Sequence, residues 1–249
     1  GQCANMDAIM ELAEAHNLFV IEDNAQAIGA SYTSKNGSKA KAGTIGHVAS
    51  TSFFPSKNLG CYGDGGAIFT NDDDLAHTIR GIVNHGMYKR YHHDVVGVNS
   101  RLDSIQAAVL DAKLPKLDTY NTARQSAARK YNTAFKNHPN IMTPKAGNGC
   151  DTICDNCDCH VFHQYTLKIQ NANRDALVAH LQEKEIPCGV YYPIPLHKQK
   201  AYVDDRYDDA DFKVTNSLID EVISLPMHTE LDDDQIDFIS STIIDFLSK

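Results

Sequence analysis

Thr51-Ser52-Phe53-Phe54-Pro55-Ser56-Lys57-Asn58-Leu59-Gly60-Cys61-Tyr62-Gly63-Asp64-Gly65-Gly66-Ala67 is the most informative stretch of this sequence. A β-forming run over residues 48–54 leads into a proline turn, then a single lysine, then a glycine-dense loop over residues 60–66. We expect these glycines to adopt positive φ and to let the backbone approach a ligand closely. Lys57 stands among apolar and glycine residues, where loss of solvation favours a neutral, nucleophilic amine. Lys57 is therefore a candidate Schiff-base lysine, and a solvated lysine in a surface turn is the alternative.

The composition is that of an ordinary globular protein. Hydrophobic residues make up 42% of the 249 residues and charged residues 22%, and the length suits one large domain or a domain and a half. The net charge of −9 and the lack of a basic tract argue against nucleic acid or an anionic membrane as partner. No membrane-length apolar run or signal peptide is visible, so we expect a cytoplasmic location.

A second candidate group lies before the lysine. Asn5 can cap a helix over residues 6–16, and an apolar strand over residues 18–21 then leads to a carboxylate at Asp23. A helix followed by an apolar strand suggests a parallel α/β sheet, in which ligands collect at the carboxyl ends of the strands. Asp23 is therefore a candidate ligand-binding carboxylate, although it could simply cap the next turn.

Hydrophobic periodicity predicts the remaining elements. Residues 31–46 are expected to form a hairpin or loop. Strands are expected over residues 66–70, 162–170 and 189–192. Helices are expected over residues 100–114, 115–137, 174–185, 214–222 and 232–247, and another helix is expected to end near residues 84–86.

Four segments together resemble the DegT/DnrJ/EryC1/StrS family of pyridoxal-phosphate (PLP) sugar aminotransferases, and the resemblance covers the whole chain. The first is the lysine stretch itself. The second is Glu-Asp-x-Ala-Gln at residues 22–26. The third is Gly-Tyr-Asn-x-Arg-Leu at residues 97–102, where Val98 replaces the aromatic residue. The fourth is His-Tyr-Pro-x-Pro-Leu-His at residues 191–197, where Tyr191 replaces the first histidine.

The resemblance implies a role for each matched residue. Lys57 would be the catalytic residue, binding PLP covalently and moving the proton between substrate and cofactor. The other cofactor contacts would be Asp23 at the pyridine nitrogen, Gln26 at the ring, Ser52 at the phosphate, and Asn99 reaching the partner's phosphate across a homodimer. The substrate contacts would be Ser56, Arg101, Tyr191 and Tyr192.

The resemblance also implies the fold, an α/β architecture of the aspartate-aminotransferase type (fold type I). Residues 1–114 would be the C-terminal part of the PLP-binding large domain, with a mostly parallel sheet. Residues 115–249 would form a bridging helix and a small α+β domain with a cysteine-rich loop at residues 146–160. The family has further chain before the matched part, including a phosphate-binding helix start. We therefore expect this chain to be a piece of a longer protein and to bind PLP poorly alone.

The expected reaction moves an amino group from L-glutamate to a nucleotide-linked ketosugar in O-antigen or capsule synthesis. The wording of the lysine stretch most resembles enzymes that act on UDP-2-acetamido-2-deoxy-3-oxo-glucuronate. A dTDP- or UDP-linked 4-oxo-6-deoxy sugar is the alternative substrate. The family's dehydratases have histidine in place of the lysine, so Lys57 argues against that branch.

The cysteines supply a hypothesis from another class, a non-catalytic metal-binding or redox-sensing module. The chain has seven cysteines, and Cys150, Cys154, Cys157 and Cys159 cluster. Their spacing resembles the iron–sulfur motif of radical S-adenosylmethionine enzymes and would also suit zinc. Because the cluster falls where the family has a variable loop, we expect reduced, solvent-facing thiols and no bound metal.

Overall fold

The computed structural model describes residues 1–147 and 158–248, which form two compact units. The first unit consists of Gly1–Thr122 and Ala146–His163. The second consists of Ala123–Lys145 and Gln164–Lys249. The units therefore meet along the chain inside a long helix, α4 (Leu117–Ala134). The domain boundary predicted at residues 114/115 lies just before this helix and stays a prediction.

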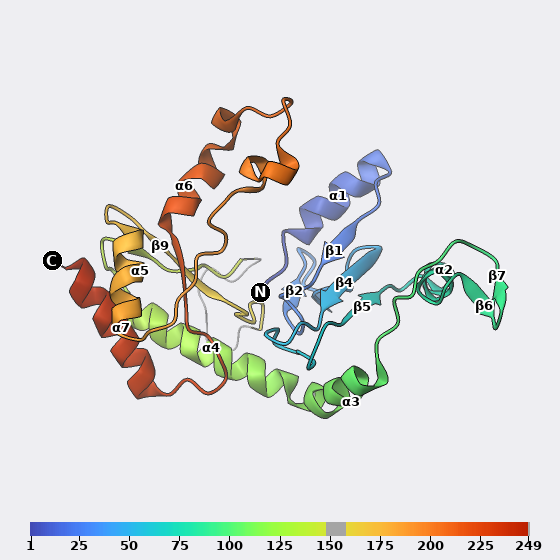
Figure 1. The fold of residues 1–249 in the computed structure, drawn as a ribbon, viewed down its shortest axis with the longest axis horizontal. Helices are drawn as coiled ribbons and strands as arrows, with labels where there is room; N and C mark the ends of the chain where they lie inside the picture. The colour runs from blue at the N-terminus through green and yellow to red at the C-terminus, as the bar shows by residue number, and fades with distance from the viewer. Residues whose placement is uncertain (148–157, 249) are drawn as a thin grey trace. The chain divides into compact units, whose positions relative to one another are not determined.

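The first unit contains the segments that carry the lysine and the candidate carboxylate (Figure 1). Its elements are α1 (Met6–His16), β1 (Ile21–Asp23), β2 (Ser31–Thr33), β3 (Lys39–Lys41), β4 (Val48–Ser52), β5 (Gly66–Phe69), α2 (Asp73–Val83), β6 (Met87–Lys89), β7 (His92–His93), α3 (Ser104–Lys113) and the 3₁₀ turn η1 (Leu114–Lys116). The helix predicted over residues 6–16 is confirmed, and Asn5 caps it by accepting a hydrogen bond from the Ala8 N–H.

The central sheet of this unit has the strand order β1-β4-β5. β1 pairs with β4 in parallel, with Asp23 opposite Ser50, and β4 pairs with β5 antiparallel. The expected strand at residues 18–21 begins later, at Ile21, because Leu18 and Phe19 lie in the exposed approach to the sheet. The parallel pair places the carboxyl ends of β1 and β4 at one edge, where the site is expected.

Two hairpins and two apolar clusters complete the first unit. β2 and β3 form the hairpin expected within residues 31–46, whereas the β6–β7 hairpin beside α2 was not predicted (Figure 1). One buried cluster contains Phe53, Leu59, Cys61, Leu110 and Leu117, and the other contains Ala27, Ala30, Ala42 and Val161. The first cluster joins the lysine stretch to α3 and the start of α4.

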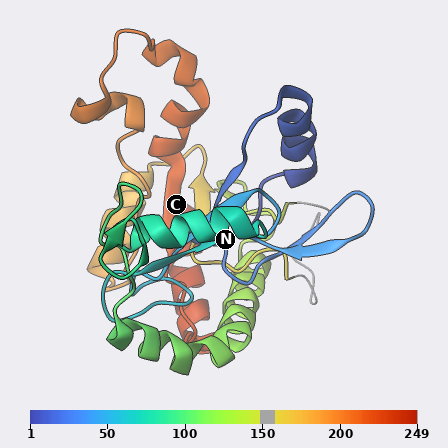
Figure 2. The ribbon, with the colours of Figure 1, turned by 90° about the vertical axis from the view of Figure 1, so that its right-hand side faces the viewer.

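The second unit is an antiparallel sheet, of strand order β10-β9-β8, with helices packed on it. Its elements after α4 are β8 (Ile141–Met142), β9 (Tyr165–Ile169), α5 (Arg174–Glu183), the 3₁₀ turns η2 (Leu196–Lys198), η3 (Lys200–Tyr202) and η4 (Asp209–Phe212), α6 (Lys213–Glu221), β10 (Val222–Leu225) and α7 (Asp233–Leu247). Helices α4 and α7 lie side by side in both views (Figures 1 and 2), and Lys130 of α4 pairs with Asp233 of α7.

The core of the second unit follows the helical and strand periodicities. Ile236, Ile239, Ser240 and Ile243 form the buried stripe of α7, at the spacing of an amphipathic helix. The strand predicted over residues 189–192 is wrong, because only an isolated bridge from Gly189 to Ser224 forms there. β10, which supplies Ser224, was not predicted, since its apolar residues continue directly from the helical pattern of α6.

Candidate active site

The parallel pairing of β1 and β4 aligns the candidate carboxylate with the approach to the lysine. The Asn24 N–H donates to the Ser50 carbonyl (2.8 Å), which fixes the end of β1 against β4. Asp23 is the last residue of β1 and is exposed, and Ser52 is the last residue of β4 and is half-buried. Asp23 and Ser52 therefore end their strands at the same edge of the sheet, and Lys57 follows Ser52 by five residues in the loop after β4.

Asp23 lies in a local turn that limits how its carboxylate is oriented. Its Oδ1 atom accepts a hydrogen bond from the Ala25 N–H (3.0 Å), the pattern of an Asx turn. The neighbouring Asn24 is buried, with 2% of its surface exposed, and Gln26 follows in the same turn and is half-buried. The capping alternative for Asp23 is therefore present in the structure, and it leaves the exposed carboxylate at the strand end.

Glu22, just before Asp23, has three backbone partners in the loop that enters β4. Its Oε1 atom accepts from the N–H groups of Ile45 (2.7 Å) and Gly46 (2.6 Å), and its Oε2 atom accepts from Gly43 (2.9 Å). A carboxylate that accepts several backbone hydrogen bonds fixes the loop around it. Glu22 was not among the predicted site residues, because its partners lie more than twenty residues away in the sequence.

The lysine loop is closed by hydrogen bonds on both sides of Lys57. The Lys57 N–H donates to the Phe54 carbonyl and the Cys61 N–H to the Phe53 carbonyl, both at 2.9 Å. The Lys113 ammonium of α3 donates to the Gly60 carbonyl (2.6 Å). Lys57 itself is half-buried, between an exposed turn over residues 54–56 and a buried run over residues 58–61. The backbone around the lysine is thus fixed by its own unit.

The glycines of this loop act differently from the prediction. Within residues 1–147 and 158–248, positive φ occurs at Gly29, Gly37, Gly43 and Gly86, and none of Gly60, Gly63, Gly65 and Gly66 adopts it. A side chain at Gly60 would lie 2.5 Å from the Pro55 carbonyl oxygen, and one at Gly66 would lie 2.7 Å from the Thr51 carbonyl oxygen. These two glycines are therefore needed because the chain packs against itself there, and the expectation of positive φ is wrong.

The two serines of the stretch lie on either side of the proline turn. Ser52 Oγ accepts a hydrogen bond from the Phe54 N–H (3.2 Å), so part of its bonding capacity serves the turn. Ser56 is exposed beside Lys57. Both side chains are at least partly exposed, as contact with a ligand near the lysine would require. Their assignments to the phosphate and to the sugar stay predictions.

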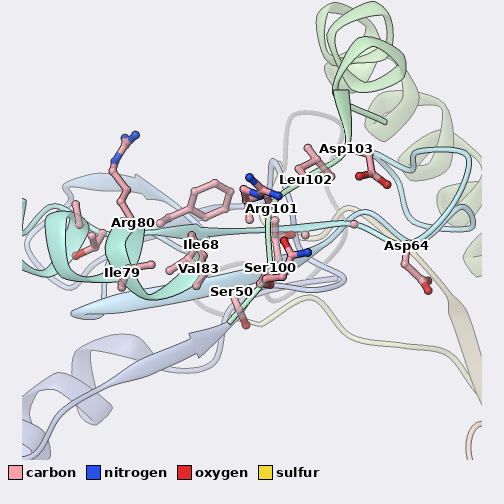
Figure 3. A pocket seen from close by; sticks show the side chains of 18 residues that line it. Ser50, Asp64, Ile68, Ile79, Arg80, Val83, Ser100, Arg101, Leu102 and Asp103 are labelled. Carbon is pink, nitrogen blue, oxygen red and sulfur yellow. The ribbon is translucent and has the colours of Figure 1, made fainter. Parts of the chain in front are cut away.

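Asn99 and Arg101 lie at a different place in the first unit, in a cavity of about 820 Å³. Figure 3 shows the side chains that line it, from the end of β4, from β5, from α2 and from residues 99–103. The segment is held to α2 by the Ser100 N–H, which donates to the Val83 carbonyl (2.9 Å). Neither Lys57 nor Asp23 lines this cavity. Ser50, which pairs with Asp23, and residues 64–67 of the lysine stretch do line it.

Tyr191 and Tyr192 belong to the second unit. Both are exposed, and their rings contact each other edge to face with centroids 5.7 Å apart. Gly189 before them is held to Ser224 by two backbone hydrogen bonds of 3.0 and 2.7 Å. After them, His197 Nε2 lies 2.9 Å from the Asp209 carboxylate. The tyrosines thus lie on an exposed segment fixed at both sides by contacts within the unit.

The cysteines and possible metal ligands are the remaining candidate functional residues. Burial, followed by the Glu22 charge, raises the pKa of the Cys3 thiol to about 11, so this thiol is un-ionised and a poor nucleophile at neutral pH. No group of three metal-ligating side chains occurs within residues 1–147 and 158–248. Cys159 is buried, and Cys150, Cys154 and Cys157 of the predicted cluster lie outside the described residues.

Known proteins resemble this chain over nearly its whole length. A UDP-2-acetamido-2-deoxy-3-oxo-D-glucuronate aminotransferase of Pseudomonas aeruginosa is 45% identical over 98% of this chain and 62% of its own length. A Geobacillus stearothermophilus protein named pleiotropic regulatory protein is 42% identical over 99% of this chain and 63% of its own length. This chain thus spans less than two thirds of the length of these relatives.

The solved structures agree with this likeness. A DegT DnrJ EryC1 StrS aminotransferase from Brucella abortus matches with a TM-score of 0.86 and 40% identity, over 99% of this chain and 62% of that one. The predicted fold, fold type I of the PLP-dependent aminotransferases, is thereby confirmed. The profile of the DegT/DnrJ/EryC1/StrS aminotransferase family matches residues 1–244. The chain therefore belongs to the DegT/DnrJ/EryC1/StrS aminotransferase family.

Proposed function

We propose that this chain carries the catalytic lysine of a PLP-dependent nucleotide-sugar aminotransferase. The observation that carries the proposal is the parallel register of β1 and β4, which ends Asp23 and Ser52 at one edge of the sheet, with Lys57 five residues after Ser52. An aminotransferase needs an amine, a carboxylate and phosphate-binding groups around one cofactor, and these three residues are of those kinds. Membership of a PLP-dependent family supports the same conclusion.

The chemistry of the predicted cofactor residues fits PLP. Lys57 would supply the amine that holds the cofactor, and Asp23 would supply a carboxylate for the pyridine nitrogen. The Gln26 side chain would lie against the ring and the Ser52 hydroxyl would donate to the phosphate. When bound, PLP supplies an electron sink that stabilises negative charge at the reacting carbon. Lys57 would then be the group that holds and moves the proton at that carbon.

Substrate recognition is assigned to Ser56, Arg101, Tyr191 and Tyr192. A guanidinium offers paired, planar donors that suit phosphate or carboxylate, and exposed tyrosines can pack against and hydrogen-bond a sugar. Asn99 is assigned to the cofactor phosphate of the partner's site in a homodimer, on the resemblance of residues 97–102 to the family motif. L-glutamate is the proposed amino donor.

The proposed ketosugar is UDP-2-acetamido-2-deoxy-3-oxo-glucuronate, in O-antigen or capsule synthesis. The name and 45% identity of the P. aeruginosa relative support it. A dTDP-3-amino-3,4,6-trideoxy-alpha-D-glucose transaminase, at 38% identity, keeps a dTDP-linked deoxysugar as the second candidate.

No helix in the described residues has the length and hydropathy of a membrane span. A cytoplasmic location stays a prediction.

The first half of the reaction can be tested by absorption spectroscopy on the full-length protein. We expect PLP to produce a visible band that L-glutamate discharges, because the amino group passes to the cofactor. Lys57→Ala removes the bond-forming amine and abolishes the protein-bound band. Lys116→Ala is the matched control, since Lys116 lies exposed in η1.

The substrate is tested by coupling this reaction to each ketosugar and identifying the product by mass spectrometry. The proposal requires an amine product from the UDP-linked 3-oxo sugar. An amine product from only the dTDP-linked sugar would select the second candidate. A band that persists in Lys57→Ala, or one that glutamate leaves unchanged, contradicts the aminotransferase proposal.

A further inference from the structure

Asn58, the residue after Lys57, is buried at the junction of three segments of the first unit. It is 7% exposed, although its side chain is a polar amide. Its Nδ2 atom donates to Asn121 Oδ1 of α4 (2.8 Å) and to the Val161 carbonyl (2.9 Å). Its Oδ1 atom lies 3.3 Å from His163 Nδ1. One side chain therefore ties the lysine loop to α4 and to residues 161–163.

The directions of these hydrogen bonds follow from the backbone carbonyls at their ends. The Val161 carbonyl only accepts, so the Asn58 amide must present its nitrogen there. The Ile28 carbonyl likewise fixes Asn121, whose Nδ2 donates to it (3.2 Å) and whose Oδ1 faces Asn58. The remaining Asn58 oxygen accepts, so His163 Nδ1 carries the hydrogen. Every member of this set is thus held in one orientation.

The position of Asn58 along the loop makes these bonds matter for the lysine. Residues 54–56 before Lys57 are exposed, whereas Asn58, Leu59 and Cys61 after it are buried. Asn58 directly follows Lys57, and its side chain is fixed by hydrogen bonds to other segments. One peptide unit separates the two Cα atoms, so a shift of Asn58 is passed to the base of the lysine side chain.

We propose that Asn58 is a positioning residue that sets the place and direction of Lys57. The inference rests on the proposed function, in which Lys57 is the reactive amine. Asn58 would act through the backbone. It holds the start of residues 58–61, so the Lys57 side chain extends from a backbone position that is fixed. Misplacing a reacting group by about 1 Å can lower a rate by about 100-fold, so the anchor is expected to affect the rate of reaction.

The test uses Asn58→Asp in the full-length protein, because aspartate has the shape of asparagine and no Nδ2 donor. A carboxylate oxygen would face the Val161 carbonyl and Asn121 Oδ1, both acceptors, so both bonds are lost. We expect glutamate to discharge the PLP band at least about 10-fold more slowly, with less than a twofold change in the half-saturating glutamate concentration. Hydrogen exchange in residues 57–61 of the cofactor-free protein should also rise.

Asn140→Asp is the matched control. Asn140 is half-buried in the second unit and its Nδ2 atom donates to the Gln170 carbonyl (2.9 Å), so the same change breaks a comparable bond away from the lysine loop. It should leave the discharge rate and the exchange of residues 57–61 unchanged. Should Asn58→Asp not fold, Asn121→Ala removes one partner of Asn58 without altering the loop, and the same changes are expected at smaller size.

The outcomes separate this inference from the proposed function. A wild-type protein without a Lys57-dependent band refutes the proposed function, and the exchange of residues 57–61 still shows whether Asn58 holds the loop. A wild-type band together with a folded Asn58→Asp variant of unchanged discharge rate and exchange overturns the positioning role alone. A slower rate that Asn140→Asp reproduces would also overturn it, because the effect would then be one of general stability.

Discussion

The carboxylate of Glu22 offers the sharpest stability prediction, since three backbone N–H groups of the loop over residues 43–46 donate to it. Glu22→Gln keeps the shape of the side chain and removes its charge. The amide oxygen can still accept from Ile45 and Gly46, as a neutral acceptor. The new amide nitrogen then faces the Gly43 N–H, where two donors meet and no hydrogen bond forms.

The expected loss is about 3 kcal/mol of unfolding free energy. A hydrogen bond to a charged group contributes about 1.5–3 kcal/mol and a neutral one about 0.5–1.5 kcal/mol, so the two weakened bonds lose about 2 kcal/mol together. The lost bond at Gly43 adds about 1 kcal/mol, because this part-buried N–H recovers some bonding from water. At about 2–4 °C per kcal/mol, the melting temperature should fall by about 6–12 °C.

Thermal unfolding followed by circular dichroism measures this change, and hydrogen exchange of residues 43–46 locates it. Glu11→Gln is the control, since Glu11 pairs with Lys35 at 2.7 Å with both side chains about two-thirds exposed (67% and 65%). Such a surface pair contributes little to stability, because solvent and salt screen its charges. Equal melting temperatures for the two variants, with unchanged exchange at residues 43–46, would refute the reasoning.

Two further predictions concern the second unit. Hydrogen bonds, led by that from Lys198, lower the pKa of Asp209 from 3.8 to about 2. The contacts this carboxylate makes should therefore be intact above about pH 4 and be lost as the pH falls toward 2. Hydrogen exchange in residues 196–212 should rise over that window in the wild type, and Asp209→Asn should show no such step. Leu181 is fully buried, so Leu181→Ala should lower stability by about 3 kcal/mol in urea unfolding, and a loss under about 1 kcal/mol contradicts that packing.

Local patterns predicted most of the helices and several of the strands. α1 matches its predicted range, and the buried stripe of α7 follows the spacing seen in the sequence. Strand β10 was missed because Val222 to Leu225 looks like the end of a helix until its partner β9 is known. The predicted strand at residues 189–192 failed for the complementary reason, since pairing reaches only Gly189. Strands depend on partners that lie far away in the sequence, whereas helices are largely local.

In the candidate site, too, local sequence patterns were predicted better than contacts between distant segments. Lys57 and Asp23 were predicted from motifs, and the parallel register of β1 and β4 places Asp23 opposite Ser50, at the end of β4 that leads to the lysine loop. The glycines were noticed for the right reason, a close approach, but the approaching group is the chain's own backbone at Pro55 and Thr51. A sequence shows that a glycine is needed more readily than it shows what would collide with a side chain.

The contacts of two polar residues beside the predicted site could not be found by pattern. Glu22 and Asn58 lie next to Asp23 and Lys57, and each stands inside a matched motif without a predicted role of its own. Glu22 binds a loop that comes more than twenty residues later, and Asn58 binds Asn121 and Val161, which lie 63 and 103 residues away. An aminotransferase lysine must react at a defined point, and that point depends on the backbone which carries it. On the proposed function, Lys57 would then account for the chemistry, and Asn58 beside it would determine where that chemistry takes place.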